Sequence, residues 1–205
     1  MLDHLTVANE ACGLATATPI QSLEAQTPAA AQVKLAYDRV LGFCLGLHRF
    51  SFSLSTRRLS RLSDPPETGW KYAFDLPADR VGAPIALSDD AKDPCRHFTA
   101  YRLEGAQVHT DAPDLWVRIR IVPHPMLWSA TFRHAFTTAL AADLALLAKR
   151  DKALREQLRA EAFGDARFNG RGGLMLAAID DDSASTPSLD NPAVTHDPLT
   201  GAWRS

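Results

Sequence analysis

The sequence predicts an α+β fold, in which a bundle of about four helices carries an inserted antiparallel β-sheet and ends in an extended C-terminal arm. Residues 115–122 alternate apolar and basic side chains, as a half-buried strand does. From Met126 onward the apolar positions recur every three or four residues, as in a helix. The 205 residues suit one domain, here about 1–169, followed by an arm at about 170–205.

Two helices are predicted ahead of the sheet, at about residues 3–14 and 28–48. Thr27 is a suitable N-cap, and Pro28 fits the first helical position because its missing N–H would have no partner there. Gly42 and Gly46 each cost helix stability, so either another backbone approaches closely or the helix tolerates them. The side chains expected to be buried are Leu5, Ala8 and Cys12 in the first helix, and Leu35 or Ala36, Val40, Cys44 and Leu47 in the second.

Two more helices are predicted after the sheet, at about residues 125–149 and 151–169. Pro125 suits a first turn, and Asp151 suits an N-cap. The glycine-rich stretch 169–173 is expected to end the last helix and to act as a hinge to the arm. The predicted bundle core consists of Phe132, Phe136, Leu140, Leu144, Val40, Cys44, Leu154 and Leu158.

The β-rich insertion is predicted at about residues 50–122. Its strands are expected at 50–54, 70–74, 81–87, 97–103, 107–109 and 115–122, with an exposed loop at 60–69. Short strands joined by consecutive tight connections favour an antiparallel sheet.

The composition of the chain limits which partners and which cellular compartment are expected for the protein. The formal net charge of −2 gives no reason to expect wrapping by nucleic acid or binding to a membrane surface. Cys12, Cys44 and Cys95 are scattered and odd in number, which fits a reducing compartment better than a disulfide framework. The chain lacks a run of about 18 apolar residues and the features of a signal peptide. We therefore expect a soluble protein that is made in a cytoplasm.

The C-terminal segment is unable to offset its own ordering entropy, because it is rich in Asp, Pro, Ser and Thr. The aspartates at 180–182 are expected to be a solvated acidic run, since an EF-hand pattern is absent. The arm is instead expected to lie along another protein surface, with Trp203 as its main anchor. The tentative partner-binding residues are Leu189, Val194, Leu199 and Trp203.

Catalytic chemistry has one candidate constellation. Cys95, His97, His109 and Asp111 could bring a thiol, two imidazoles and a carboxylate together on neighbouring strands. None of these groups has a second ligand at the spacing of zinc motifs, so we expect no catalytic residue, no metal and no cofactor. These residues leave one alternative to a non-catalytic role, in which the protein is a small hydrolase or ligand-binding domain that uses His97, His109 and Asp111.

Basic residues form the other candidate site. Phosphate contacts by several arginines would give a salt-dependent DNA affinity. Contacts between subunits or with solvent are the alternatives. The carboxylates of a neighbouring subunit are the expected partners of Arg118 and Arg120. The candidates are Arg49, Arg57, Arg58, Arg61, Arg118 and Arg120.

Residues 8–11, 19–23, 70–79 and 128–165 resemble the head-to-tail adaptor proteins of tailed bacteriophages, and among them the tail tubular protein A type. The shared features are an N-terminal helix, a long second helix, the strand phrase Tyr72-Ala-Phe-Asp-Leu-Pro77-Ala-Asp79, a Phe/Ala/Leu-rich helix pair and an extended C-terminal segment. The resemblance implies a ring, commonly of twelve copies, in the neck of a virion assembled in the host cytoplasm. Its partners would be the portal protein, a downstream tail or nozzle protein and passing double-stranded DNA that is not read for sequence, with no membrane involved.

Overall fold

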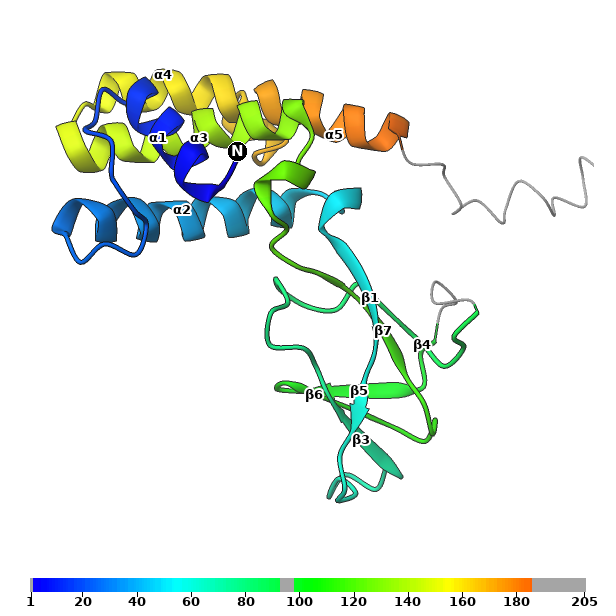
Figure 1. Cartoon of the computed structure of the whole chain (residues 1–205). Helices are drawn as coiled ribbons and strands as arrows, with labels where there is room; N and C mark the ends of the chain where they lie inside the picture. Colours follow the sequence, from blue (N-terminus) through cyan, green and yellow to red (C-terminus); the bar gives the residue numbers. More distant parts are fainter. Residues whose placement is uncertain (1, 93–97, 186–205) are drawn as a thin grey trace, which may run out of the picture.

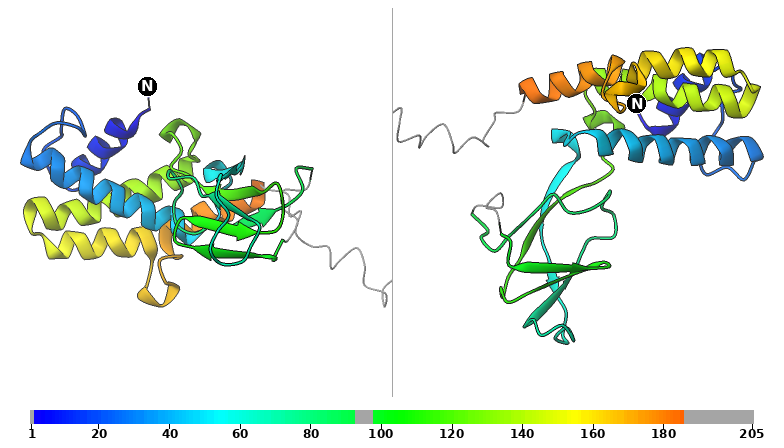
Figure 2. Two further views of the ribbon diagram at one scale, coloured as in Figure 1. Left: turned by 90° about the horizontal axis from the view of Figure 1, so that it is seen from below. Right: turned by 180° about the vertical axis from the view of Figure 1, so that it is seen from behind.

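The computed structural model describes residues 2–92 and 98–185, and it shows the α+β class that the sequence predicts (Figure 1). Five α-helices lie together in one lobe, and the residues between α2 and α3 form a β lobe that projects from it (Figure 2). The helices are α1 (His4–Leu14), α2 (Pro28–Leu47), α3 (Ala130–Lys149), α4 (Lys152–Phe163) and α5 (Gly173–Ser185), with 3-10 turns η1 (Ser51–Ser53), η2 (Pro125–Leu127) and η3 (Ala166–Phe168). The strands are β1 (Leu54–Arg58), β2 (Ser60–Arg61), β3 (Tyr72–Asp75), β4 (Ala86–Ser88), β5 (Tyr101–Glu104), β6 (Gln107–Thr110) and β7 (Trp116–Arg120).

Helix α3 is the centre of the bundle, since it contacts each of the other four helices. The predicted core is confirmed: Phe132, Phe136, Leu140 and Leu144 are buried, and they share one cluster with the residues expected from α2 and α4. Of the two alternatives on α2, Ala36 is the buried one, whereas Leu35 is 70% exposed.

The β lobe has a separate core and two antiparallel sheets rather than one. The strand orders are β1-β7-β4 and β2-β3-β6-β5. Three local predictions were wrong. The strand predicted at 81–87 is limited to β4, which begins only at Ala86. Residues 51–53 form η1 before the first strand begins at Leu54, because Phe50 turns into the bundle and packs 4.7 Å from the Phe132 ring. The predicted loop at 60–69 begins with the short strand β2, where Ser60 pairs with Asp75.

Capping residues set the helix ends. Thr27 and Asp151 are N-caps as predicted, and each side chain accepts a backbone N–H of its helix. Helix α3 begins at Ala130 instead of 125, because the Ser129 hydroxyl caps it by accepting the N–H of Phe132. Helix α4 ends at Phe163 rather than 169, because Gly164 adopts a positive φ of 68° that stops the helix.

Helix α5 corrects the prediction that the arm is extended from residue 170. Met175, Ala178 and Asp182 recur at helical spacing and are buried against the bundle. The predicted hinge is a tight turn: a Cβ on Gly172 would lie 2.6 Å from the carbonyl oxygen of Phe163, and one on Gly173 would lie 2.2 Å from that of Glu161. Glycine is needed here because the start of α5 packs directly on the end of α4. By contrast, a Cβ on Gly42 or Gly46 meets nothing within 4 Å, so no close approach explains the glycines of α2.

Asp182 corrects the prediction that residues 180–182 are a solvated run. Its carboxylate is 6% exposed and accepts the backbone N–H of Ser51 at 2.9 Å, the Ser51 hydroxyl at 2.6 Å and a contact from His48 Nε2 at 3.2 Å. This contact joins α5 to the segment where the chain leaves α2 for β1. A chain truncated after Ala178 would lack Asp182 and therefore this contact. A truncation that removes the arm and keeps the fold should instead end at Ser185.

Candidate functional site

The six arginines singled out from the sequence are spread from the junction of the two lobes along the β lobe, and they do not share one face. Arg49 follows α2, Arg57 and Arg58 lie on β1, Arg61 lies on β2, and Arg118 and Arg120 lie on β7. In the antiparallel pair of β1 and β7, Thr56 is opposite Arg118 and Leu54 is opposite Arg120. Because side chains alternate along a strand, Arg58 shares a face with Arg118 and Arg120, and Arg57 lies on the opposite face.

Arg57, Arg58 and Arg61 each have a partner within the chain. Arg57 donates two hydrogen bonds to Asp79, at 2.9 and 2.8 Å, and this bonding lowers the pKa of the Asp79 carboxyl. Arg58 pairs with Asp114, and its guanidinium also lies 5.8 Å from the Trp116 ring centre. The Arg61 guanidinium lies 4.9 Å above the ring of Tyr72. The two carboxylates offset the charge that Arg57 and Arg58 offer to phosphates, whereas the neutral ring of Tyr72 does not offset that of Arg61.

Arg49 and Arg120 lie close enough for their charges to interact. Burial, and then the nearby charge of Arg49, lower the pKa of Arg120. The Arg120 Nε is buried and has no hydrogen-bond partner within the described residues. An anion brought by another molecule would relieve this arrangement, so a role in subunit or DNA contact stays a prediction for these residues.

The positions of His109 and Asp111 give little support to the hydrolase alternative. His109 is buried, and its Nδ1 lies 2.9 Å from the hydroxyl of Thr68. Asp111 is exposed and accepts the backbone N–H of Lys71 at 3.0 Å. Cys95 and His97 lie outside the described residues, as do the anchors Leu189, Val194, Leu199 and Trp203. Within residues 2–92 and 98–185, no group of three or more His, Cys, Asp or Glu side chains is arranged to hold a metal.

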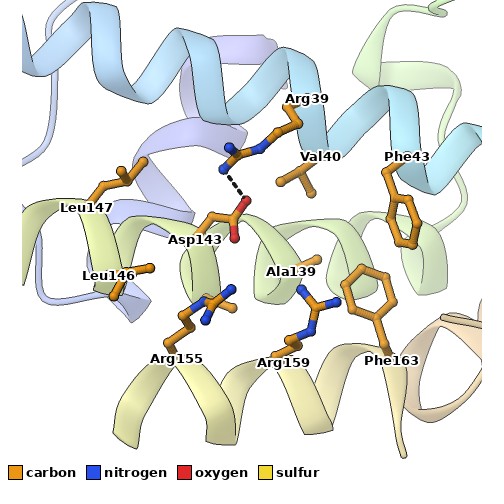
Figure 3. A pocket seen from close by; sticks show the side chains of 11 residues that line it. Arg39, Val40, Phe43, Ala139, Asp143, Leu146, Leu147, Arg155, Arg159 and Phe163 are labelled. Carbon is orange, nitrogen blue, oxygen red and sulfur yellow. Dashed lines mark hydrogen bonds and ion pairs between the residues drawn. The ribbon is translucent and has the colours of Figure 1, made fainter. Parts of the chain in front are cut away.

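A third site, which was not predicted from the sequence, is a groove of about 380 Å³ between α2, α3 and α4 (Figure 3). Arg39 on α2 pairs with Asp143 on α3 at 2.7 Å. Arg155 and Arg159 extend from α4 toward the same space, and Phe43 and Phe163 pack edge to face at one end, with ring centres 5.4 Å apart. Helix α2 is distant in sequence from the consecutive helices α3 and α4, so spacing along the chain could not bring these residues together in advance.

Comparisons with known proteins do not identify the chain: no family model matches it, and neither does any curated protein sequence. In the part of the chain that the structure describes, no helix is long and apolar enough to cross a membrane.

Proposed function

We propose that this chain is a structural head-to-tail adaptor of a tailed bacteriophage. In this function it forms a ring under the portal, extends the DNA channel and provides the platform on which the next tail or nozzle protein assembles. The support is the sequence resemblance, together with an order of elements that agrees with it: a short helix, a long helix, a β insertion and then a helix pair. The protein would be part of the virion neck and would have no catalytic role.

The observation that carries the proposal is the two-lobed shape (Figure 1). The β lobe leaves the bundle and returns to it through the neighbouring strands β1 and β7, so the two lobes offer separate surfaces to different partners. Close to this junction, Val122, Met126 and Leu127 are 49%, 56% and 64% exposed. Large apolar side chains gathered on a surface mark contacts with other proteins.

The state of the arginines also supports a conduit. DNA must pass through the channel without being held, and a row of unpaired arginines would hold it in a salt-dependent manner. Arg57 and Arg58 are instead neutralised by Asp79 and Asp114. The formal net charge of the chain is −2. A neighbouring subunit, rather than DNA, is the partner we assign to Arg49 and Arg120.

Mixing the purified chain with portal rings of the same phage tests the proposal. We expect the chain to sediment with the portal and to appear in electron micrographs as an added ring on its tail-side face. A chain truncated after Ser185 serves as the matched control, since it keeps every described helix. A full-length chain that stays monomeric or dimeric with the portal present would favour the ligand-binding or hydrolase alternative.

A further inference from the structure

The groove between α2, α3 and α4 carries a charge pattern that its own residues do not balance. Arg39 and Asp143 satisfy each other. The remaining guanidinium groups, Arg155 and Arg159, have no ion pair with any carboxylate in residues 2–92 and 98–185. The Nε of Arg155 is buried and makes no hydrogen bond to these residues. Two positive side chains one helical turn apart therefore face a partly enclosed space whose lining carboxylate, Asp143, is already paired with Arg39.

The rest of the lining is apolar. Val40, Ala139 and Ala142 form part of it, and Phe43 and Leu147 lie at 47% and 43% exposure. The Arg159 guanidinium lies 5.9 Å from the ring centre of Phe163. A groove with an apolar lining and two guanidinium groups suits a carboxylate carried on an apolar segment, because the apolar part covers the lining while the carboxylate pairs with the arginines.

Helix α5 offers such a segment. Leu176 is 45% exposed, and Asp180, one turn further on, is also exposed. Residues four apart lie on the same side of a helix, so an apolar and an acidic side chain are presented together. Asp180 has no partner within the described residues, whereas Asp181 accepts the Thr131 hydroxyl and Asp182 is buried.

Geometry excludes docking of α5 into the groove of its own chain. Asp182 holds α5 against Ser51, and α4 and α5 extend toward opposite ends of the bundle (Figure 1). The groove and the face of α5 that carries Leu176 and Asp180 are thus two different surfaces of one molecule. Contacts between different surfaces of identical chains run head to tail, and they form a ring when the rotation closes.

We propose that the groove binds the face of α5 that carries Leu176 and Asp180, from a second copy of this chain. The second copy's Asp180 pairs with Arg155 and Arg159, and its Leu176 packs against Phe43 and Leu147. The proposal rests on the adaptor function, because it names the contact that builds the ring.

A charge swap tests this contact. We expect Arg159→Asp and Asp180→Arg each to raise the concentration at half-assembly by about tenfold or more, since each change places like charges together. The double variant should return to within about threefold of the wild type, because it restores an opposite pair. Analytical ultracentrifugation and native mass spectrometry at low ionic strength give the readout, and urea unfolding of each monomer checks that the fold is intact.

Arg171→Asp is the matched control, because Arg171 is exposed and is not among the residues that line the groove. It should assemble like the wild type. Rings that form equally well from Arg159→Asp would refute the contact and leave the adaptor function standing, as would a folded double variant that is not restored. A defect seen only when the portal is added would give the groove to the portal instead. A wild-type chain that forms no ring, alone or with the portal, would refute the proposed function as well.

Discussion

Replacing Asp182 with alanine should destabilise the protein by about 2–4 kcal/mol. Its carboxylate serves the backbone N–H and the hydroxyl of Ser51 and contacts His48, and it is 6% exposed. A hydrogen bond to a charged group contributes about 1.5–3 kcal/mol, but these contacts are not additive, and water can reach the exposed Ser51 once the carboxylate is removed. The expected loss is therefore well below the sum of the separate bonds.

Urea denaturation measures this loss as a lower midpoint at an unchanged slope. Asp180→Ala is the matched control, because it makes the same chemical change on the same helix at an exposed position. Any gain in helix propensity, up to about 0.7 kcal/mol, is common to both variants, so their difference isolates the contact with Ser51. If the two variants unfold within about 0.5 kcal/mol of each other, Asp182 does not hold α5 to the junction.

The remaining predictions concern the core, the pH response and the arm. Phe136→Ala should cost about 3–5 kcal/mol by leaving a cavity among fully buried side chains, whereas Phe168→Ala, at a half-exposed ring, should cost below about 1 kcal/mol in the same assay. Burial, and then the charge of His124, hold the pKa of His4 below its ordinary 6.5, so unfolding takes up a proton and the free energy of unfolding falls as the pH drops through 6.5. His4→Phe should flatten this fall, and a fall of equal size in the variant would contradict the assignment. Truncation after Ser185 should leave the unfolding midpoint unchanged and abolish portal docking; full docking of the truncated chain would remove residues 186–205 from the interface.

The bundle was predictable because its burial follows a single period. Phe132, Phe136, Leu140 and Leu144 repeat every four residues along α3, and they are buried as that repeat indicates. The two sheets were less predictable, because short strands such as β2 depend on their partners. Local capping decided the ends of α3 and α4, and it is visible in the sequence only once the correct cap is chosen.

Helix α5 was missed because one of its buried positions is an aspartate. Met175, Ala178 and Asp182 form its inward face. An acidic residue is read as exposed unless its partner is known, and the donors here, Ser51 and His48, lie more than 130 residues away in sequence. The groove was missed for the same reason, since Arg39 and Asp143 are 104 residues apart. Sequence periodicity reports which side of an element is buried, and long-range polar partners are invisible to it.

The position of Asp182 ties the two proposed contacts together. It fixes α5 to the segment that leads from α2 into β1, so the face of α5 that the groove binds keeps a set position relative to the β lobe. A second copy that binds this face is thereby oriented relative to the β lobe as well as to the bundle. Residues 186–205 follow directly after Ser185, so a portal contact by the arm would start from the same junction. Loss of the Asp182 contact should therefore weaken both ring assembly and portal docking. The Arg159→Asp change should weaken ring assembly more than portal docking.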